Sequence, residues 1–238
     1  MCVTAHPDDE CFAFGGALAL AAEQGVETYV ICFTDGQAAS YRGDATSPAE
    51  LGRSRRAEFD ASCKVLGVSR HEVLDYQDGQ LEFAGFSHAA GRLVEKMRAY
   101  KPHVVLTFSS DGAVNTHADH TMVSAFTCAA YHWAASPKRY KDLGPIHHAE
   151  RLYLLTTSYF MEGRPAPMPA PWTVTLDIRH LMERKQEAFN QHTSQAPLVE
   201  QTREMFAQFG QSEHYQLAAV REPQPAVQQT SFFDGLKP

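Results

Sequence analysis

The stretch AHPDDE at residues 5–10 places one imidazole beside three carboxylates. These side chains belong to His6, Asp8, Asp9 and Glu10. Carboxylates this close repel one another, so a compensating partner is expected, either a bound cation or solvent. A second stretch, HADH at residues 117–120, again joins imidazoles to a carboxylate. Because imidazole nitrogens and carboxylate oxygens are metal ligands, the two stretches together indicate a metal site.

The spacing within each stretch supports a shared metal. His6 and Asp9 are three residues apart, as are His117 and His120. A helical turn beginning at Pro7 would aim the first pair at one centre, and a helix over the second pair would put both histidines on one face. His6, Asp9 and His120 then form a His₂Asp set, which is typical of a catalytic zinc site. The same ligands also suit iron(II) or manganese.

The neighbouring polar residues could carry the chemistry at such a centre. Asp8 would face a metal-bound water and accept its proton as the general base. His117 would stabilise an oxyanion or protonate a leaving amine. Asp119 would orient an imidazole from behind the ligands. Taken singly, each stretch could instead be an acidic or exposed helix start, and the metal interpretation depends on their joint occurrence.

The elements that position these residues alternate between strand and helix. Apolar, β-branched runs predict strands at 1–5, 27–34, 71–76, 103–110, 151–160, 172–178 and 214–220. Helical patterns cover 15–25, 48–66, 86–100, 116–135, 179–192 and 198–209. This alternation is typical of right-handed βαβ units and a parallel sheet. We therefore expect an α/β fold, a Rossmann-like three-layer sandwich with a mostly parallel central sheet.

The polar clusters follow the first, second and fourth predicted strands. They are HPDDE at 6–10, TDG at 34–36 and SSDGAVNTHADH at 109–120. Ligands of open parallel sheets bind outside the carboxyl ends of the strands, so all three clusters should lie at one edge.

Composition limits the class of protein. The formal net charge of −7 argues against a nucleic-acid backbone or an anionic membrane as the main partner. No apolar run reaches the roughly 18 to 20 residues of a membrane span, and no signal-peptide pattern is seen. Five cysteines without a CxxC pair suit a reduced cytoplasmic protein. We expect one domain over 1–238, with 221–238 as an extended surface tail.

Several further motifs accompany the two stretches. They are Gly15-Gly16, the TDG turn, Arg55 and Glu58 before LGV at 66–68, DG-x-L at 78–81, and HTSQ at 192–195. With AHPDDE and HADH, over most of residues 1–200, the sequence resembles the LmbE-like, or PIG-L, family of zinc-dependent N-deacetylases. That family acts on N-acetylglucosaminyl compounds.

The resemblance implies hydrolysis of an acetamide to a free amine and acetate, on a small N-acetylated amino sugar conjugate. It implies one zinc ion per chain, with iron(II) as the alternative, on the three ligands named above, and Asp8 as the general base. Arg55 would contact the sugar, unless it simply pairs with Glu58 or Asp60 on a helix surface. His192 and Gln195 would pack or cap a helix end. Whether the chain forms a homo-oligomer is left open.

The chain departs from the family pattern beside the second histidine stretch. Ala118 replaces a proline, and Thr116 replaces a glycine. Neither change removes a ligand, and both lie where substrate would sit, so they bear on substrate identity rather than on catalysis.

Three other functions remain as alternatives. A nucleotide-binding Rossmann-type module would need GxGxxG after the first strand, which GGALAL does not supply. A metal-dependent hydrolase of another amide, an ester or a phosphoester would use similar ligands, although two-metal phosphatases generally need more carboxylates. A non-catalytic metal-binding module would have no use for a base at Asp8.

Overall fold

The computed structural model describes residues 1–159 and 166–236, in two compact units. The N-terminal unit comprises residues 2–80 and 176–213. The C-terminal unit comprises Met1, the described part of 81–175, and the chain from His214 onward.

Three parallel strands form the sheet of the N-terminal unit. They are β1 (Cys2–Thr4), β2 (Tyr29–Thr34) and β3 (Arg70–Tyr76), in the order β3-β2-β1. Val3 pairs with Ile31, and Ile31 pairs with Glu72. Every residue of β1 and β2 is buried, as expected for continuous apolar strands covered on both faces.

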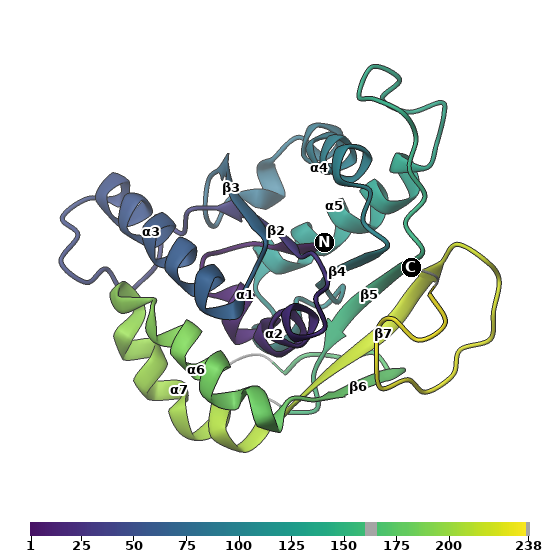
Figure 1. Cartoon of the computed structure of the whole chain (residues 1–238). Helices are drawn as coiled ribbons and strands as arrows, with labels where there is room; N and C mark the ends of the chain where they lie inside the picture. The colour runs from purple at the N-terminus through teal and green to yellow at the C-terminus, as the bar shows by residue number, and fades with distance from the viewer. Residues whose placement is uncertain (160–165, 237–238) are drawn as a thin grey trace. The chain divides into compact units, whose positions relative to one another are not determined.

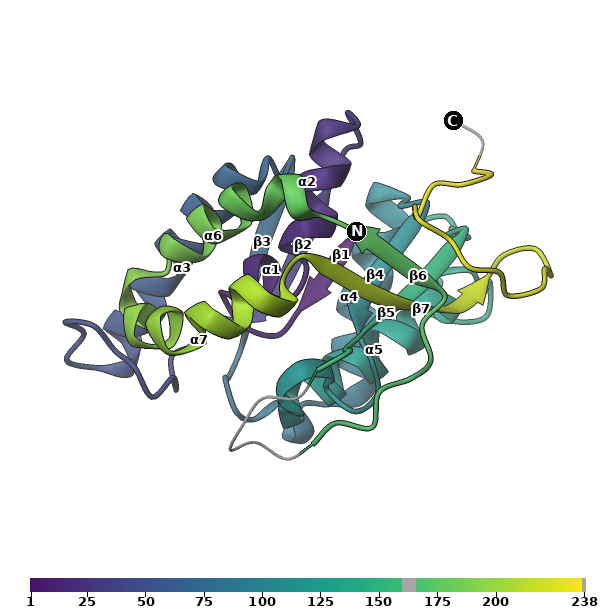
Figure 2. The same cartoon turned by 90° about the horizontal axis from the view of Figure 1, so that it is seen from below.

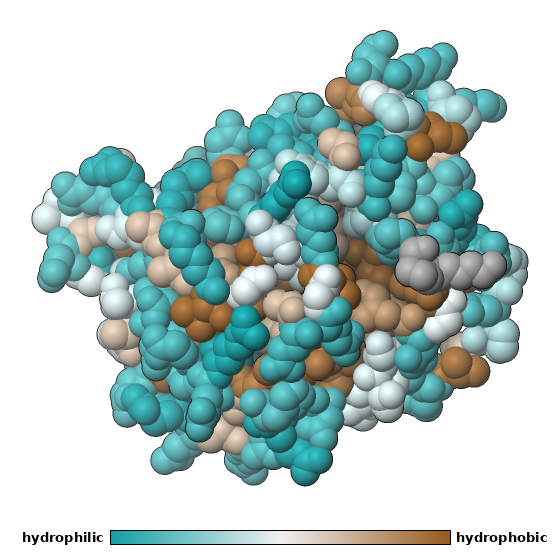
Figure 3. Space-filling model, in the orientation of Figure 1, coloured by the Kyte–Doolittle hydropathy of each residue, from teal (hydrophilic) through white to brown (hydrophobic). Residues whose placement is uncertain are grey.

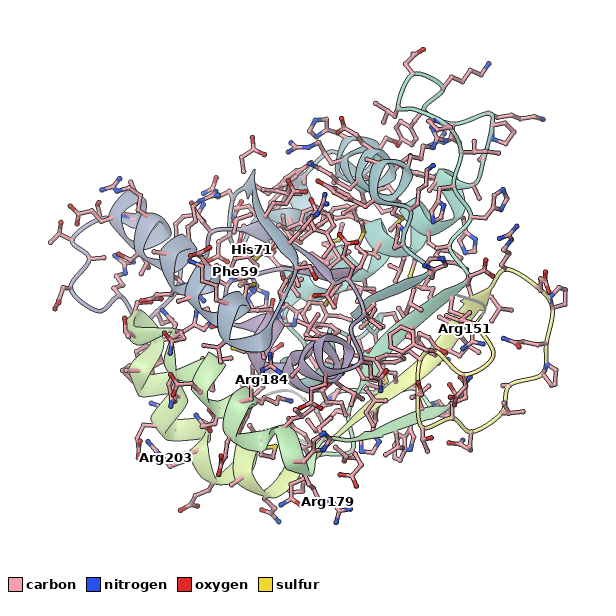
Figure 4. The ribbon with its side chains drawn as sticks, in the orientation of Figure 1. Phe59, His71, Arg151, Arg179, Arg184 and Arg203 are labelled. Carbon is pink, nitrogen blue, oxygen red and sulfur yellow. The ribbon has the colours of Figure 1, made fainter. Side chains whose placement is uncertain are left out.

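Five helices accompany these strands in the described part of the N-terminal unit. They are α1 (Asp9–Phe12), α2 (Gly15–Glu23), α3 (Pro48–Leu66), α6 (Met182–Asn190) and α7 (Ala196–Phe209). Figures 1 and 2 show α3, α6 and α7 side by side, and the visible surface of α6 and α7 is largely hydrophilic (Figure 3). The ring of Phe59 on α3 meets His71 on β3 edge-on, with centroids 5.5 Å apart (Figure 4).

Gly15-Gly16 allows a buried ion pair to approach the start of α2. The carboxylate of Glu213 accepts hydrogen bonds from Gly16 N at 2.7 Å and Ala17 N at 2.9 Å. Lys185 Nζ lies 2.6 Å from the same carboxylate. A Cβ at Gly16 would lie 2.2 Å from Ile178 Cδ1, so the close packing requires glycine here.

The C-terminal unit contains β4, β5, two long helices, and the greater part of β7 with the first half of β6. They are β4 (Val104–Phe108), β5 (Arg151–Thr156), β7 (Ser212–Val220), β6 (Val174–Asp177), α4 (Phe86–Tyr100) and α5 (Ala118–Ala134). The strand order is β4-β5-β7-β6, with β4 parallel to β5 and β7 antiparallel to β5. The α4 and α5 helices pack on one another, and buried Arg98 of α4 donates to the carbonyl of Ala134, the last residue of α5.

Short 3₁₀ turns complete the described elements. They are η1 (Leu81–Phe83), η2 (Ala113–Asn115), η3 (Arg179–Leu181) and η4 (Thr193–Gln195). None of the described helices has the length and apolar character that crossing a membrane requires.

The α/β class and the mostly parallel strands are confirmed, and the predicted bounds of α3 and α4 match the structure. Two local predictions were wrong. The helix expected at Pro7 begins at Asp9, and His117 precedes α5 in an extended conformation instead of sharing a helical face with His120. The predicted strand at 151–160 ends at Thr156, and residue 160 and the start of the proline-rich connection at 163–172 lie outside the described residues.

The chain after Arg221 is mostly exposed to residue 229, as predicted for a tail. It is nevertheless attached to its own unit, because Gln229 forms a bridge with Val174 and the Phe232 side chain is buried. The guanidinium of Arg151 donates to Phe232 O at 2.9 Å. The single domain expected over 1–238 stays a prediction.

Candidate metal centre and catalytic residues

The Asp9 carboxylate is fixed by the backbone immediately before α1. Its Oδ2 accepts hydrogen bonds from Ala5 N at 3.1 Å and from His6 N at 2.8 Å. Oδ2 also lies 3.7 Å from His6 Nδ1. The turn that follows β1 therefore brings the His6 and Asp9 side chains together, as the spacing predicted, and both are buried.

The other nitrogen of His6 is held by Asp78, which the sequence analysis placed in the DG-x-L motif without giving it a role in the site. His6 Nε2 donates to Asp78 Oδ1 at 3.0 Å, and Asp78 Oδ2 accepts from Ala38 N at 3.0 Å. Burial alone would raise the pKa of Asp78, but its hydrogen bond and charge interaction with His6 lower it overall. A carboxylate behind a histidine is the arrangement that orients metal-binding imidazoles, and a metal bound by His6 would be held through Nδ1.

Asp8, which lies between His6 and Asp9 in the sequence, has an unusual backbone conformation. It is the N-cap of α1 with φ at 111°, and its Oδ2 accepts from Arg55 Nη2 at 2.9 Å. Burial raises the pKa of Asp8 to about 6, against the lowering effect of the Arg55 charge. A carboxyl group with this pKa is suited to exchanging a proton near neutral pH.

Arg55 reaches this position from the middle of α3 and is 3% exposed. Besides Asp8, its guanidinium donates to Pro7 O and, at 3.0 Å, to Gly36 O. It does not form the surface pair considered from the sequence, since Glu58 accepts from Ser194 and Asp60 pairs with Lys64. Contact between Arg55 and a sugar stays a prediction.

His120 is buried in the first turn of α5. Its Nδ1 donates to Gly112 O at 3.1 Å, and its ring stacks on Phe108 with centroids 3.9 Å apart. The carbonyl and the stacked ring together fix the imidazole plane, and a metal would be bound through Nε2. This arrangement parallels that of His6, with one nitrogen engaged by an oxygen acceptor.

His117 and Asp119 occupy the N-terminal cap of α5. His117 Nδ1 accepts a hydrogen bond from Asp119 N at 3.1 Å, so the proton of the neutral ring is on Nε2. Such an N–H group suits stabilisation of an oxyanion. The Asp119 carboxylate accepts from Leu81 N at 3.1 Å and so ties η1 to this cap. The role predicted for Asp119, orienting an imidazole, stays a prediction.

A buried network lies behind Asp8 and was not expected from the sequence. Glu10 accepts from Ser62 Oγ at 2.5 Å and from His192 Nε2 at 2.7 Å. Burial disfavours the charged form of both side chains. Their attraction and hydrogen bond nevertheless help to lower the pKa of Glu10 and to raise that of His192. The HTSQ motif was the available signal, and it was interpreted as packing or capping.

Three side chains in and beside this network are close enough together to bind a metal ion. Donor atoms of Glu10, Cys11 and His192 lie within 4.8 Å of one another. Burial raises the pKa of the Cys11 thiol well above its ordinary value, which disfavours the thiolate that a metal requires. We therefore interpret these residues as an internal hydrogen-bond network.

His6, Asp9 and His120 each have the surroundings expected of a metal ligand. All three are buried, and each histidine has one nitrogen held by an oxygen acceptor. The Asp9 carboxylate is anchored by two amides. These are the supports expected around metal ligands rather than around surface histidines.

The family model PIG-L, described as GlcNAc-PI de-N-acetylase, matches residues 1–131. This is more than half of the chain, and the chain belongs to that family. A 1D-myo-inositol 2-acetamido-2-deoxy-alpha-D-glucopyranoside deacetylase from Rhodococcus jostii (strain RHA1) is 28% identical over 241 aligned residues. The alignment covers 83% of this chain and 81% of the relative.

Two solved structures show the fold at low sequence identity. N,N'-diacetylchitobiose deacetylase from Pyrococcus horikoshii matches with a TM-score of 0.73 and 21% identity, over 100% of this chain and 85% of its own. GalB, the 4-carboxy-2-hydroxymuconate hydratase from Pseudomonas putida KT2440, matches with a TM-score of 0.73 and 23% identity, over 94% and 97%. Because the second is a hydratase, likeness of fold does not by itself choose the reaction.

Proposed function

We propose that this protein is a metal-dependent hydrolase that removes the acetyl group from an N-acetylated amino sugar, in the class of N-acetylglucosaminyl conjugates. Family membership and the deacetylase relatives support the reaction class. The observation that carries the proposal is Asp8, which has a raised pKa and is held by Arg55, next in sequence to Asp9, whose carboxylate lies 3.7 Å from His6 Nδ1. A hydrolase needs a base at this position, and a binding module does not.

His6, Asp9 and His120 would hold one metal ion, zinc by the donor chemistry or iron(II) in its place. The ion, when bound, lowers the pKa of water and polarises the amide carbonyl. Both ligand segments follow parallel strands, β1 and β4, at the carboxyl ends where such sheets bind ligands. This location supports the proposed ligand set.

The side chains would divide the proton transfers and charge stabilisation between them. Asp8 accepts a proton from the attacking water, which adds to the acetyl carbon, and later delivers it to the amine nitrogen as the C–N bond breaks. His117 donates a hydrogen bond from its Nε2–H to the carbonyl oxygen that becomes negative. Acetate and a free amine result. Arg55 holds the Asp8 carboxylate in place throughout.

The proposal is tested by amine release from a panel of acetylated sugars. The panel contains N-acetylglucosamine, its inositol and malate conjugates, and diacetylchitobiose. Zinc-loaded protein, chelated protein and an Asp8→Asn variant are compared, with Glu82→Gln as an exposed carboxylate control.

We expect release that requires both metal and Asp8, with the Asn variant about 10² to 10⁴-fold slower. The control variant should match the wild type. Absence of release on every member, in protein shown to contain one metal ion, would overturn the amino-sugar assignment. Activity that survives in Asp8→Asn would overturn the role of the base.

A further inference from the structure

The HTSQ segment at residues 192–195 contacts three different parts of the N-terminal unit. His192 bonds to Glu10 after β1, Ser194 bonds to Glu58 on α3, and Gln195 Nε2 donates to Tyr41 O at 2.9 Å. We propose that His192 is a positioning residue that fixes the general base Asp8 through Glu10. This inference rests on the proposed function, because it assigns His192 a role in the same site.

Asp8 needs external support to keep its backbone conformation. Its φ of 111° is unfavourable for a residue with a side chain. Asp8 N donates to Glu10 Oε2 at 2.9 Å, and Asp8 O accepts from Phe12 N at 2.9 Å and from Cys11 Sγ at 3.0 Å. The Asp8 amide is bonded to a side chain, that of Glu10. Because a side chain can rotate, this is the hydrogen bond that a substitution nearby can alter.

Glu10 can hold that amide only while its own carboxylate is fixed. The other oxygen, Oε1, accepts from Ser62 Oγ and His192 Nε2, and all three side chains are fully buried. His192 is 182 residues away in sequence and is held in place by the start of η4. Without the His192 N–H, Oε1 of Glu10 keeps one of its two donors, Ser62, in a fully buried position. Rotation of the carboxylate would then release the Asp8 amide.

Ser194, in the same HTSQ motif, provides a matched control for substitutions of His192. Ser194 Oγ and Ser194 N donate to the Glu58 carboxylate at 2.7 Å each. Ser194→Ala removes one buried hydrogen bond of the same motif but leaves the bonds from His192 to Glu10 and from Glu10 to Asp8. A general weakening of the fold would affect both variants, whereas a positioning role is specific to His192.

The test compares His192→Leu, His192→Gln and Ser194→Ala in metal-loaded protein. We expect His192→Leu to lower kcat by about 10²-fold, the effect of a small misplacement of a catalytic group. KM and metal content should change little. His192→Gln can still donate to Glu10 and should recover most of the loss, and Ser194→Ala should retain the wild-type kcat. A loss of kcat shared equally by Leu and Ala variants, or a change confined to KM, would overturn the proposal.

A second measurement is independent of the reaction. Hydrogen exchange at the Asp8 amide should be faster in His192→Leu than in the wild type, and unchanged in Ser194→Ala. If the wild type hydrolyses no member of the panel, the proposed function fails and this exchange still decides the positioning role. Equal exchange at Asp8 in all variants would overturn it. If His192→Leu does not fold, Ser62→Ala removes the other donor to Glu10 and should give a smaller effect of the same kind.

Discussion

Asp78 holds His6 through a buried contact in which His6 Nε2 donates to Asp78 Oδ1 at 3.0 Å. The aspartate belongs to the turn after β3, and the histidine follows β1, so segments after the two strands that flank β2 meet through this pair. The contact fixes both the plane and the tautomer of the imidazole. It also leaves Nδ1 as the nitrogen on the side of Asp9, where the metal is proposed.

Replacing Asp78 should weaken metal binding. In Asp78→Ala the imidazole loses its orienting partner, and we expect metal affinity to fall about 10 to 100-fold. Competition with a chromogenic chelator measures the affinity directly. The exposed Glu82→Gln variant should bind metal as the wild type does, and an unchanged affinity in Asp78→Ala would contradict the proposed role.

Replacing Arg55 should separate positioning of Asp8 from substrate contact. Lysine keeps the positive charge but cannot reach Asp8, Pro7 O and Gly36 O together, as the planar guanidinium does. We expect Arg55→Lys to lower kcat by about 10²-fold, because the base is displaced. Steady-state kinetics gives the answer, and a rise in KM with unchanged kcat would instead support sugar contact by Arg55.

Gly16→Ala should destabilise the N-terminal unit. The new Cβ would lie 2.2 Å from Ile178 Cδ1 and 2.8 Å from Glu213 Oε1, and Ile178 is fully buried. We expect a loss of about 1 to 3 kcal/mol from overpacking, partly offset by the better helix propensity of alanine. Chemical denaturation measures it. Gly15→Ala, whose Cβ would be 3.0 Å from Lys185 Cγ, should lose less. Equal midpoints for all three proteins would contradict the packing argument.

The contribution of His192 to stability should depend on pH. Burial lowers the pKa of His192, but the attraction and hydrogen bond to Glu10, with the charge of Asp8, together raise it above the ordinary value of 6.5. The charged pair therefore adds its full stability below about pH 6.5 and loses it as pH rises through the raised pKa. Glu10 stays ionised over this range because its pKa is lowered.

Comparison with His192→Gln isolates this effect, since glutamine does not titrate. The difference in free energy of unfolding between wild type and variant should be largest at about pH 5.5 and should shrink toward about pH 9. Denaturation series at several pH values measure it. A difference that stays constant or grows with pH would show that His192 is not charged in the folded protein.

Local chemistry allowed several elements to be predicted closely. Ser47 caps α3, Pro48 opens it, and Gly67 ends it in the left-handed region, so its bounds could be placed from the sequence alone. The buried strands were recognisable because their apolar runs have no polar alternation. Residues 1–131 also match the family expected from the motifs. The assignment of metal ligands and base stays a prediction.

The start of α1 could not be predicted in the same way. Proline favoured a helix beginning at Pro7, but Asp8 adopts a positive φ and the helix begins at Asp9. Contacts that hold Asp8 come from Arg55 and, through Glu10, from His192, and they outweigh local propensity. Sequence spacing carries no information about such distant partners.

The sequence by itself determined which side chains are available for chemistry and which strands they follow, because motifs and apolar runs are local patterns. Tertiary structure decided what each side chain is bonded to. Only the fold paired His6 with Asp78, placed Arg55 on Asp8, and gave HTSQ a part in the network behind the base. These pairings depend on burial of charged groups, whose partners must come from wherever the chain returns to the same interior.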